Sequence, residues 1–564
     1  MDILQQRIYS NDYADIILPF HYTTSQGFVD FFAKYSPQII NQQYALLHVP
    51  VDIQSQYNPG QFLYSAIPNL FTLLDTLSLE ASGILQAQIQ PALQLNGENI
   101  LMGFIDTGIS YTHPAFQTSS GTSRIVCIWD QTIPSETNAG PFGYGTEYTK
   151  EEIDKALRSD NPLEVVPSTD TNGHGTFLAG VAAGTPNLQA DFTGVAPMSQ
   201  IAVVKLKEAK QHLKDFYFHS SNAPVYQEND IMTAIEYLFR LSRDLNLPLV
   251  LCLGLGSNQG DHLGTTPLDI SIQNLSFYPG VILVAAAGNE AGKAHHFTSN
   301  VTSSEPISVE ILVPENSDGF FVELWGNPPE LFSVGFRSPI GETIARIPAR
   351  LNESETIEFF LQDTKIYLTY ELVQNTSGSQ LVFIRFERPT PGIWTIDVYA
   401  AYQITGNFHM WLPISNFLSP DITFVTPNPY TTITTPANTP FIITTAAYDA
   451  VTKSIFLNSS RGFTRNNQVK PDFAAPGVNL TGPNLRNGYT TQTGTSASAA
   501  LTAGCCALFM QWGKKRNPNQ YYSTTELKNF FIRGADRSLP ITYPSREWGY
   551  GTLDLYNIFT TLTS

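Results

Sequence analysis

Thr493-Gly494-Thr495-Ser496-Ala497-Ser498-Ala499-Ala500, followed by Leu501-Thr502-Ala503-Gly504, is the stretch around which the chain is organised. It predicts a tight turn leading into a helix of small residues, because Gly494 lets the backbone turn sharply and alanine is a good helix former. We expect Thr495 to cap this helix. Ser496 then lies at a helix N-terminus, where exposed N–H groups and the helix dipole favour an alkoxide or an oxyanion. Taken alone, the pattern equally fits a buried helix capped by a serine.

Two further stretches favour a catalytic interpretation. Leu101-Met102-Gly103-Phe104-Ile105-Asp106-Thr107-Gly108 predicts a buried strand with the Asp106 carboxylate at its C-terminal end. Asn172-Gly173-His174-Gly175-Thr176-Phe177-Leu178-Ala179-Gly180 places a glycine-flanked histidine, His174, at the start of another small-residue helix. An acid, a base and a hydroxyl nucleophile, each at the end of an element beside glycine, are the parts of an activated serine. Asp106, His174 and Ser496 are therefore the candidate catalytic residues.

Composition excludes several classes of function. The chain has 564 residues, of which 42% are hydrophobic and 14% charged. This balance suits a large buried core, in several domains or in one large domain with additions. The formal net charge of −18 gives no electrostatic footprint for nucleic acid or for an anionic membrane. No stretch approaches the ~18 consecutive apolar residues of a membrane span, so we expect none.

The N-terminus and the cysteines indicate where the protein is made. Met1-Asp2-Ile3-Leu4-Gln5-Gln6-Arg7 lacks the charged-then-apolar pattern of a signal peptide. The four cysteines have apolar neighbours and no spacing typical of zinc ligands or of a disulfide framework; they are Cys127, Cys252, Cys505 and Cys506. We therefore expect buried reduced thiols and synthesis in the cytoplasm, a reducing compartment.

A small N-terminal unit is expected to precede an α/β core. Residues 1–76 predict an α+β unit, with strand-like runs and a helical segment between them. From residue 77 to 297, strand-like runs alternate with helical segments, which predicts a parallel sheet flanked by helices. In this core we expect helices at 88–95 and, capped by Asp230, up to Arg243; strands at 101–106, 201–206, 248–256 and 281–287; a polar surface insertion at 118–168; and an irregular loop at 208–229.

The pattern changes between residues 298 and 432. Strand-like runs recur there at roughly ten-residue spacing and are separated by Gly, Pro, Asn and Ser turns, which predicts an inserted antiparallel β-sandwich. The runs are 307–313, 319–325, 331–336, 356–361, 365–372, 380–386, 392–400 and 408–414. The core is expected to resume over residues 433–564 and to contain the serine motif.

The order Asp106, His174, Ser496, with these flanking residues, resembles that of the subtilisin-like serine proteases. The resemblance covers residues 77–300 and 430–560 and rests on three separate motifs. It implies that Asn289, at the end of the 281–287 strand, donates its side-chain amide to the oxyanion, although asparagine is also common in turns after strands. It also implies that Gly254, Leu255 and Gly256 form the edge that pairs with substrate backbone.

The same resemblance carries expectations about processing and ligands. Residues 1–76 resemble a prodomain that acts as a folding template and leaves its tail in the substrate cleft, with a processing point between Leu73 and Ser78. An ordinary N-terminal extension is the alternative. Many subtilases bind calcium, but Thr185-Pro186-Asn187-Leu188-Gln189-Ala190-Asp191 is no firm ligand set, and we expect no metal and no cofactor. Two departures are Phe177, where many subtilases have a second histidine, and Gly254, where many have serine.

A subtilase core with a sandwich inserted at this point and a short prodomain most resembles the clostridial germination proteases of the Csp type. That resemblance implies a jelly-roll sandwich that clamps the core, a retained prodomain, packaging in the spore, and activation of the zymogen of a spore-cortex lytic enzyme. Some relatives have lost triad residues, whereas this chain keeps all three. A regulatory binding protein locked by its own prodomain and a broad intracellular subtilase remain as alternatives.

Overall fold

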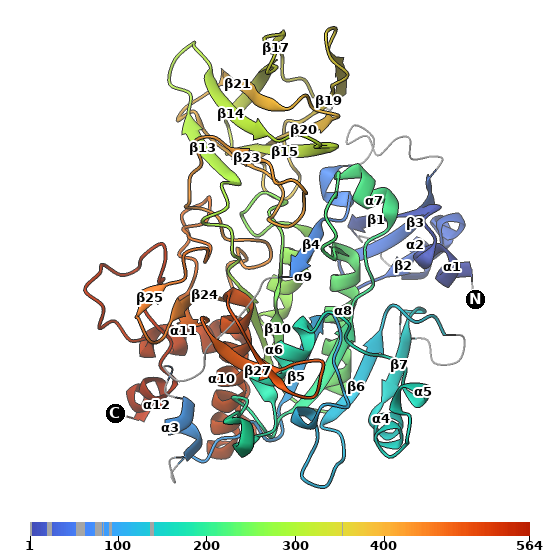
Figure 1. The fold of residues 1–564 in the computed structure, drawn as a ribbon, viewed down its shortest axis with the longest axis vertical. Helices are drawn as coiled ribbons and strands as arrows, with labels where there is room; N and C mark the ends of the chain where they lie inside the picture. The colour runs from blue at the N-terminus through green and yellow to red at the C-terminus, as the bar shows by residue number, and fades with distance from the viewer. Residues whose placement is uncertain are drawn as a thin grey trace.

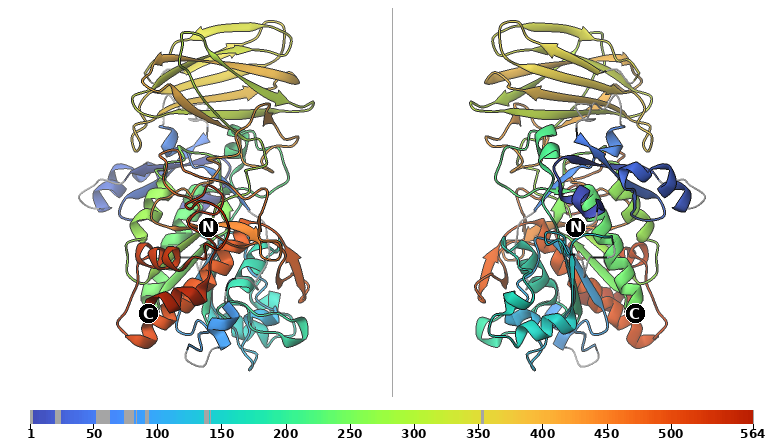
Figure 2. Two further views of the ribbon diagram at one scale, coloured as in Figure 1. Left: turned by 90° about the vertical axis from the view of Figure 1, so that its left-hand side faces the viewer. Right: turned by 90° about the vertical axis from the view of Figure 1, so that its right-hand side faces the viewer.

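A computed structural model describes residues 3–19, 25–51, 63–73, 82, 84–89, 93–135, 140, 142–351 and 354–563. The molecule is elongated. An antiparallel β-region lies at one end of its long axis, the N-terminal sheet lies to one side, and a parallel sheet with its helices fills the remainder (Figure 1). The views at right angles show the two sheets of the β-region lying one over the other (Figure 2).

The central sheet is predominantly parallel. Among the described residues it has nine strands, in the order β25-β24-β12-β10-β5-β8-β6-β7, with β26 paired to β24. The pairs from β6 through β24 to β26 are parallel, and only β7 and β25 run antiparallel to their neighbours. The strands are β5 (Leu101–Asp106), β6 (Ile125–Asp130), β7 (Thr146–Thr149), β8 (Gln200–Lys205), β10 (Leu249–Leu253), β12 (Val281–Ala286), β24 (Ile443–Asp449), β25 (Ser454–Ile455) and β26 (Phe473–Pro476).

Helices cover both faces of this sheet, which explains why its inner strands are continuous apolar runs. Met102 and Phe104 of β5 pack in one hydrophobic cluster with α6 (His174–Ala183) and α10 (Thr495–Arg516). Leu101 and Ile105, which alternate with them, pack in a second cluster with α8 (Glu228–Asp244) and α9 (Pro267–Leu275). The expected α/β fold with a parallel sheet flanked by helices is confirmed.

The N-terminal unit contains α1 (Ile3–Tyr9) and α2 (Ser25–Phe31) beside a three-stranded antiparallel sheet of order β1-β3-β2. Its strands are β1 (Tyr13–Pro19), β2 (Gln38–Ile39) and β3 (Tyr44–Pro50). After residues 52–62, which lie outside the described part, a short 3-10 helix (Tyr64–Ala66) leads to β4 (Leu70–Leu73). β4 leaves this unit and joins the core, where it lies between β9 (Tyr226–Gln227) and β11 (Leu255–Gly256).

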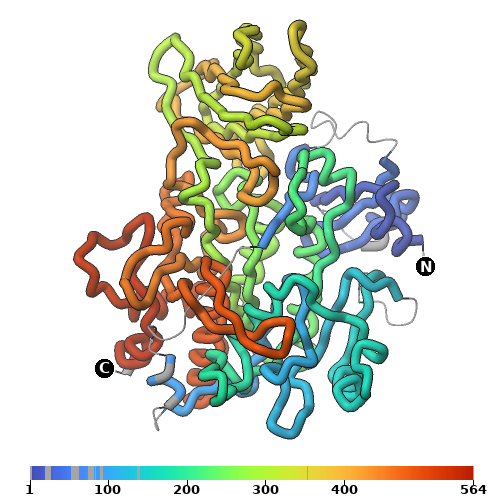
Figure 3. Tube along the Cα trace, in the orientation of Figure 1, coloured from blue at the N-terminus to red at the C-terminus, as the bar shows by residue number. Residues whose placement is uncertain are grey.

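Residues 296–424 contribute two antiparallel sheets, of order β13-β22-β15-β20-β19-β18 and β17-β16-β21-β14-β23. Phe386 of β20 stacks on Phe320 of β15 and contacts Trp394 of β21 edge-on, so aromatic rings join the two sheets. The chain leaves the parallel sheet for this region and later returns alongside its outgoing path (Figure 3). The strands are β13 (His296–Asn300), β14 (Ile307–Val313), β15 (Gly319–Gly326), β16 (Leu331–Arg337), β17 (Thr343–Ile347), β18 (Ser354–Glu358), β19 (Lys365–Glu371), β20 (Gln380–Glu387), β21 (Gly392–Tyr402), β22 (Asn407–Trp411) and β23 (Thr423–Phe424).

Three local expectations about the core are wrong. The segment 118–168 is not a surface insertion, because β6 lies inside the sheet next to β8 and its Ile128 and Trp129 are buried. The loop at 208–229 contains α7 (Gln211–Phe216) and β9. The helix expected at 88–95 is α3 (Ile84–Ile89), and residues 93–95 are not helical.

Two expected helix caps are also wrong. Gly494 is the N-cap of α10, and Thr495 is the first helical residue. Gln227 precedes α8, so Asp230 falls within its first turn, where its buried carboxylate accepts a hydrogen bond from Lys207 Nζ at 2.6 Å.

All four cysteines are buried and none forms a disulfide. None of the described helices has the length and apolarity needed to cross a membrane.

Candidate active site

The three candidate catalytic side chains each lie at the end of an element. Asp106 is the last residue of β5, at the C-terminal edge of the parallel sheet. His174 is the first residue of α6, preceded by Gly173 with φ of +98°, a conformation that glycine adopts readily and other residues rarely. Ser496 is the second residue of α10. The sheet edge and the two helix starts therefore deliver a carboxylate, an imidazole and a hydroxyl to one place.

The geometry joins these groups in a chain. His174 Nδ1 lies 2.8 Å from Asp106 Oδ1 and 2.9 Å from Oδ2, and His174 Nε2 lies 3.3 Å from Ser496 Oγ. A carboxylate only accepts hydrogen bonds, so it holds the ring proton on Nδ1 and leaves Nε2 to accept from the serine hydroxyl. All three residues are buried, with exposed fractions of 1%, 4% and 0% for Asp106, His174 and Ser496.

Asp170 is a supporting residue that lies just outside the histidine motif and was not predicted from the sequence. Its Oδ1 accepts hydrogen bonds from the backbone N–H of Asn172 and Gly173 at 2.9 and 2.8 Å. Its Oδ2 accepts from Thr176 N at 3.0 Å and from Thr176 Oγ1 at 2.7 Å. One carboxylate thus holds the turn before His174 and the first turn of α6. An aspartate shortly before a predicted helix start was the signal for it.

Asn289 lies beside the turn that carries Ser496. Its Oδ1 accepts hydrogen bonds from Thr495 N and Thr495 Oγ1, both at 3.2 Å. Thr495 Oγ1 in turn accepts from Gly288 N at 3.1 Å. Thr495, expected to be a helix cap, therefore orients the Asn289 amide instead. Because the oxygen end of that amide is bound to Thr495, the Nδ2 end is its hydrogen-bond donor.

Gly254 leaves no room for a side chain beside the candidate catalytic groups. A Cβ built on it would lie 2.5 Å from Leu178 Cδ1, 3.1 Å from His174 Cε1 and 3.4 Å from Ser496 Cβ. The first distance is shorter than real Cβ contacts, and the second is tighter than most of them. The glycine at this position is therefore what lets the β10–β11 edge approach the histidine and the serine closely.

The edge expected to receive substrate is already paired with the protein's own chain. Leu255 and Gly256 pair antiparallel with Leu73 and Thr72 of β4. On its other side β4 pairs with β9, and Leu70 N donates to Gln259 Oε1 at 2.8 Å. The structure thus brings Asp106, His174, Ser496, Asn289 and the Gly254–Gly256 edge to one region, with β4 across it.

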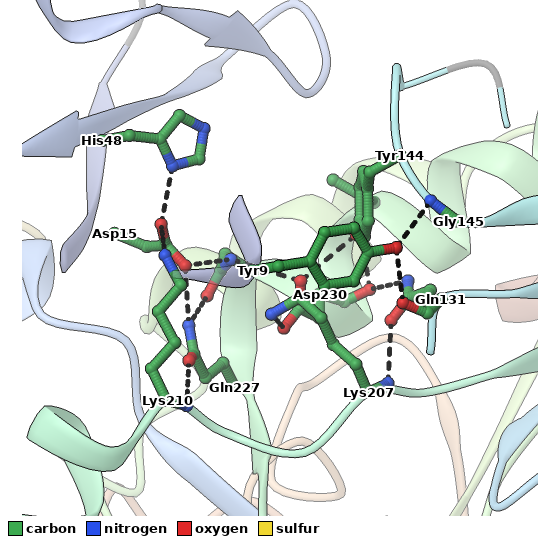
Figure 4. A network of polar contacts seen from close by, with 12 residues as sticks. Tyr9, Asp15, His48, Gln131, Tyr144, Gly145, Lys207, Lys210, Gln227 and Asp230 are labelled. Atoms are coloured by element: carbon green, nitrogen blue, oxygen red, sulfur yellow. Dashed lines mark hydrogen bonds and ion pairs between the residues drawn. The ribbon is translucent and has the colours of Figure 1, made fainter. Parts of the chain in front are cut away.

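A buried ionic network holds the N-terminal unit on the core (Figure 4). Asp15 Oδ1 of β1 lies 2.8 Å from Lys210 Nζ and 2.7 Å from His48 Nδ1, and its Oδ2 accepts from Gln227 Nε2 at 2.9 Å. Burial raises the pKa of Asp15, but the lysine and the histidine outweigh burial and hold it well below its usual range. Nearby, Tyr9 OH donates to Gln131 O at 2.9 Å. The N-terminal unit is thus held on the core by a buried ion pair, in which each charge needs the other as its counter-ion.

No group of three or more His, Cys, Asp or Glu side chains able to hold a metal ion occurs in the part of the chain that the structure describes.

The model of the subtilase family (peptidase S8) matches residues 97–320 and 405–551. The chain belongs to the subtilase family. These two matched ranges cover the β5, α6, β12 and α10 segments that carry the four candidate residues, and they omit most of the antiparallel region.

A solved structure described as the Clostridium perfringens CspB protease resembles this subtilase over nearly its whole length. The two share 29% of residues with a TM-score of 0.76, and the match covers 86% of this chain and 98% of that one. The expected kinship with subtilisin-like proteases of the Csp type is confirmed.

Among curated proteins, the subtilisin-like protease SBT2.4 of Arabidopsis thaliana is 33% identical over 19% of this chain and 15% of its own length. The PIII-type proteinase of Lactococcus lactis is 22% identical over 76% of this chain and 22% of its own length, and subtilisin E of Bacillus subtilis is 24% identical over 39% and 42%. This subtilase thus spans only part of the length of these curated relatives.

Proposed function

We propose that this subtilase is a serine endopeptidase in which Ser496 attacks the scissile carbonyl. His174 takes the serine proton and returns it to the leaving amine, while Asp106 orients the imidazole and stabilises its charged form. The observation that carries this proposal is the continuous chain from Asp106 through His174 to Ser496, at 2.8 Å and 3.3 Å. The start of α10 adds a helix N-terminus beside the developing negative charge.

The oxyanion in this proposal is held by Asn289 Nδ2 and the backbone N–H of Ser496. Support comes from Thr495, which binds the Asn289 Oδ1 and so fixes which end of the amide acts as donor. Substrate backbone would pair with Gly254, Leu255 and Gly256 by strand addition, as β4 does with Leu255 and Gly256.

We further propose that residues 1–76 are a prodomain, cut by the enzyme itself between residues 73 and 78 and retained afterwards. β4 runs along the substrate edge in antiparallel register and ends at Leu73, which supports this assignment. Residues 74–78 lie outside the described part of the chain. The proposed division continues with the core at 77–297, a jelly-roll clamp at 298–432 and the remaining core at 433–564.

The proposed substrate is the zymogen of a cortex-lytic enzyme, cut during spore germination by a protease packaged in the spore. The likeness to the CspB protease supports this assignment. A second candidate is a regulatory binding protein kept shut by its own N-terminal unit. The pairing of β4 with both β9 and β11 favours it, because this strand covers the edge that substrate needs.

Labelling with a fluorophosphonate and intact mass spectrometry of the purified chain test the endopeptidase proposal. We expect one phosphonyl group on Ser496 and two fragments that meet between residues 73 and 78. Ser496→Ala should give an unlabelled, uncut chain. Ser498→Ala is the matched control, because this hydroxyl lies on the same helix but donates to the carbonyls of Ala475 and Pro476 at 3.1 and 3.2 Å. An unlabelled, uncut wild-type chain would favour the binding protein.

A further inference from the structure

Glu290, the residue after Asn289, turns its carboxylate into the protein interior and is only 2% exposed. Its Oε2 accepts hydrogen bonds from Asn258 Nδ2 at 3.1 Å, His295 Nδ1 at 2.9 Å and Ser415 N at 3.2 Å. Its Oε1 accepts from Ser415 Oγ at 2.5 Å. Four donors from three separate segments therefore converge on one buried carboxylate, a density that holds its position tightly.

His295 supplies the positive charge that balances this carboxylate. Its Nδ1 faces Glu290, and its Nε2 lies 3.1 Å from both carboxylate oxygens of Asp421. Since carboxylates only accept, both ring nitrogens donate, and the ring is an imidazolium. Burial disfavours this charge, but the hydrogen bonds with Asp421 and Glu290 outweigh it and raise the pKa of His295 to about 9.

The backbone of Glu290 is fixed as well as its side chain. Glu290 N donates to Ser460 Oγ at 3.0 Å, and Ser460 N donates to Gly288 O at 2.8 Å. Asn289 is thus enclosed between two anchored neighbours, while Thr495 binds its amide oxygen. A shift of the backbone at Asn289 would therefore strain the contacts made by Gly288 and Glu290.

The three segments that meet at Glu290 belong to different parts of the fold. Asn258 follows the β11 edge by two residues and also donates to Leu412 O at 3.3 Å. Ser415 and Asp421 lie between β22 and β23, in the connection that joins the two antiparallel sheets. Leu412 N donates to His295 O at 2.9 Å, which ties this connection to the loop after β12.

We infer that Glu290, with His295 as its counter-ion and Asp421 as the outer anchor, is a positioning residue that holds Asn289 in place to stabilise the oxyanion. The inference rests on the proposed endopeptidase function and adds to it a role for the antiparallel region. That region supplies the outer end of the network, through Ser415 and Asp421. It thereby helps to fix the position of Asn289 without contacting substrate.

A purely structural ion cluster is the competing interpretation, and coupling to Asn289 separates the two. If Glu290 acts through Asn289, removing the Asn289 amide should make Glu290 irrelevant to the chemistry. If Glu290 only stabilises the fold, its loss should have the same effect with or without that amide. Residues that act as a unit give non-additive losses, and residues that act independently give additive ones.

The test measures the rate at which a fluorophosphonate labels Ser496 in the full chain, since the phosphonyl oxygen occupies the oxyanion position. Glu290→Gln is expected to slow labelling by about tenfold or more, because small displacements of a catalytic group are costly. In an Asn289→Ala background the same change should slow labelling by less than about twofold. Asp397→Asn is the matched control, a buried carboxylate within the antiparallel region that binds Arg337 and Ser308 instead, and should label at the wild-type rate.

Asp421→Asn provides a second variant in case Glu290→Gln does not fold, because the Asp421 side chain is 46% exposed. It should slow labelling by a smaller factor and lose this effect in the Asn289→Ala background. Equal slowing in both backgrounds, or no slowing by either variant, overturns the inference while the proposed function stands. A wild-type chain that is never labelled overturns the proposed function, and the positioning role with it.

Discussion

Leu73 of β4 pairs with Leu255 of β11 in antiparallel register, so the N-terminal segment occupies the sheet edge next to Gly254 and the candidate triad. A polypeptide substrate that adds a strand there must displace β4 or wait for it to leave. If substrate pairs with this edge as proposed, the stability of the N-terminal unit on the core controls access to the site, and the contacts that hold this unit can be tested by substitution.

Replacing Asp15 with Asn should loosen the N-terminal unit. The change leaves the Lys210 ammonium, 2.8 Å from the lost charge and almost fully buried, without its counter-ion. Breaking a buried ion pair by removing one partner costs about 3–5 kcal/mol. We expect faster hydrogen exchange across β1 and faster labelling of Ser496, both measured on the full chain.

The exposed Asp12 is the control for this prediction, because its carboxylate accepts a local hydrogen bond from Ser10 at 3.1 Å. Asp12→Asn should leave exchange and labelling unchanged. Equal exchange in wild type and Asp15→Asn would mean that apolar contacts alone hold the unit.

Adding a methyl group at Gly254 should impair catalysis more than folding. The new Cβ would lie 2.5 Å from Leu178 Cδ1 and 3.1 Å from His174 Cε1, so Leu178 and the imidazole would both have to shift. Overpacking of this kind costs roughly 1–3 kcal/mol, and a displaced His174 is expected to lower kcat by about tenfold or more. Peptide hydrolysis and thermal unfolding, measured on Gly254→Ala, separate the two effects.

A second substitution tests whether the contact with Leu178 causes the loss of kcat in Gly254→Ala. Gly254→Ala combined with Leu178→Ala removes the nearest methyl groups and should recover part of the lost kcat. A double variant no faster than Gly254→Ala would place the damage elsewhere than in this contact.

Asn289→Ala should lower kcat by about a hundred- to a thousand-fold with little change in KM, the size of effect measured for the equivalent donor in subtilisin. The amide is proposed to bind charge that exists only in the transition state, so ground-state binding is spared. Steady-state kinetics on a peptide anilide measure both constants. A rise in KM at constant kcat would instead assign Asn289 to substrate binding.

Short apolar runs with glycine at their ends were predictable from the sequence. β5, β10 and β12 lie where their Val, Ile and Leu content indicated, since burial on both faces demands such runs. The motifs around Asp106, His174 and Ser496 also indicated element ends. β6 was missed because its apolar run, Ile125–Asp130, lies within a long polar segment.

The polar networks were not predictable, because no periodicity links their members. Asp15 and Lys210 lie 195 residues apart, and Glu290 and Asp421 join through His295, 126 residues from Asp421. Asp230 shows the same limit: it lies in the first turn of α8, where its carboxylate binds Lys207, and it does not cap the helix. Tertiary partners override local preferences wherever a charge is buried.

Glu323 of β15 should make the attachment of the N-terminal segment depend on pH. Its carboxylate accepts hydrogen bonds from Tyr64 OH, from Trp325 Nε1 at 3.0 Å and from Gly260 N at 3.0 Å, so one buried side chain joins the N-terminal segment, the core and the antiparallel region. Burial raises the pKa of Glu323 to about 7 despite these hydrogen bonds, and the nearby charge of Asp261 adds to the effect.

The raised pKa of Glu323 determines whether stability rises or falls with pH. The unfolded chain has a glutamate pKa of about 4.3, so the folded state binds the proton more tightly. The stabilisation is fully present below about pH 4.3 and is lost as the pH rises through about 7. The attachment should therefore weaken between pH 5.5 and pH 8, by about 2 kcal/mol for this group.

Glu323→Gln keeps a neutral side chain at every pH. It should therefore remove the contribution of Glu323 to the pH dependence of stability. Other buried carboxyls with pKa raised to about 7 will keep the remainder; they are Glu228, Asp269 and Glu371. Thermal unfolding and the proteolytic susceptibility of the segment at 63–73, each followed at pH 5.5 and pH 8, measure the difference. Identical pH slopes for wild type and Glu323→Gln would show that Glu323 does not titrate in this range and that the three-way contact is insensitive to pH.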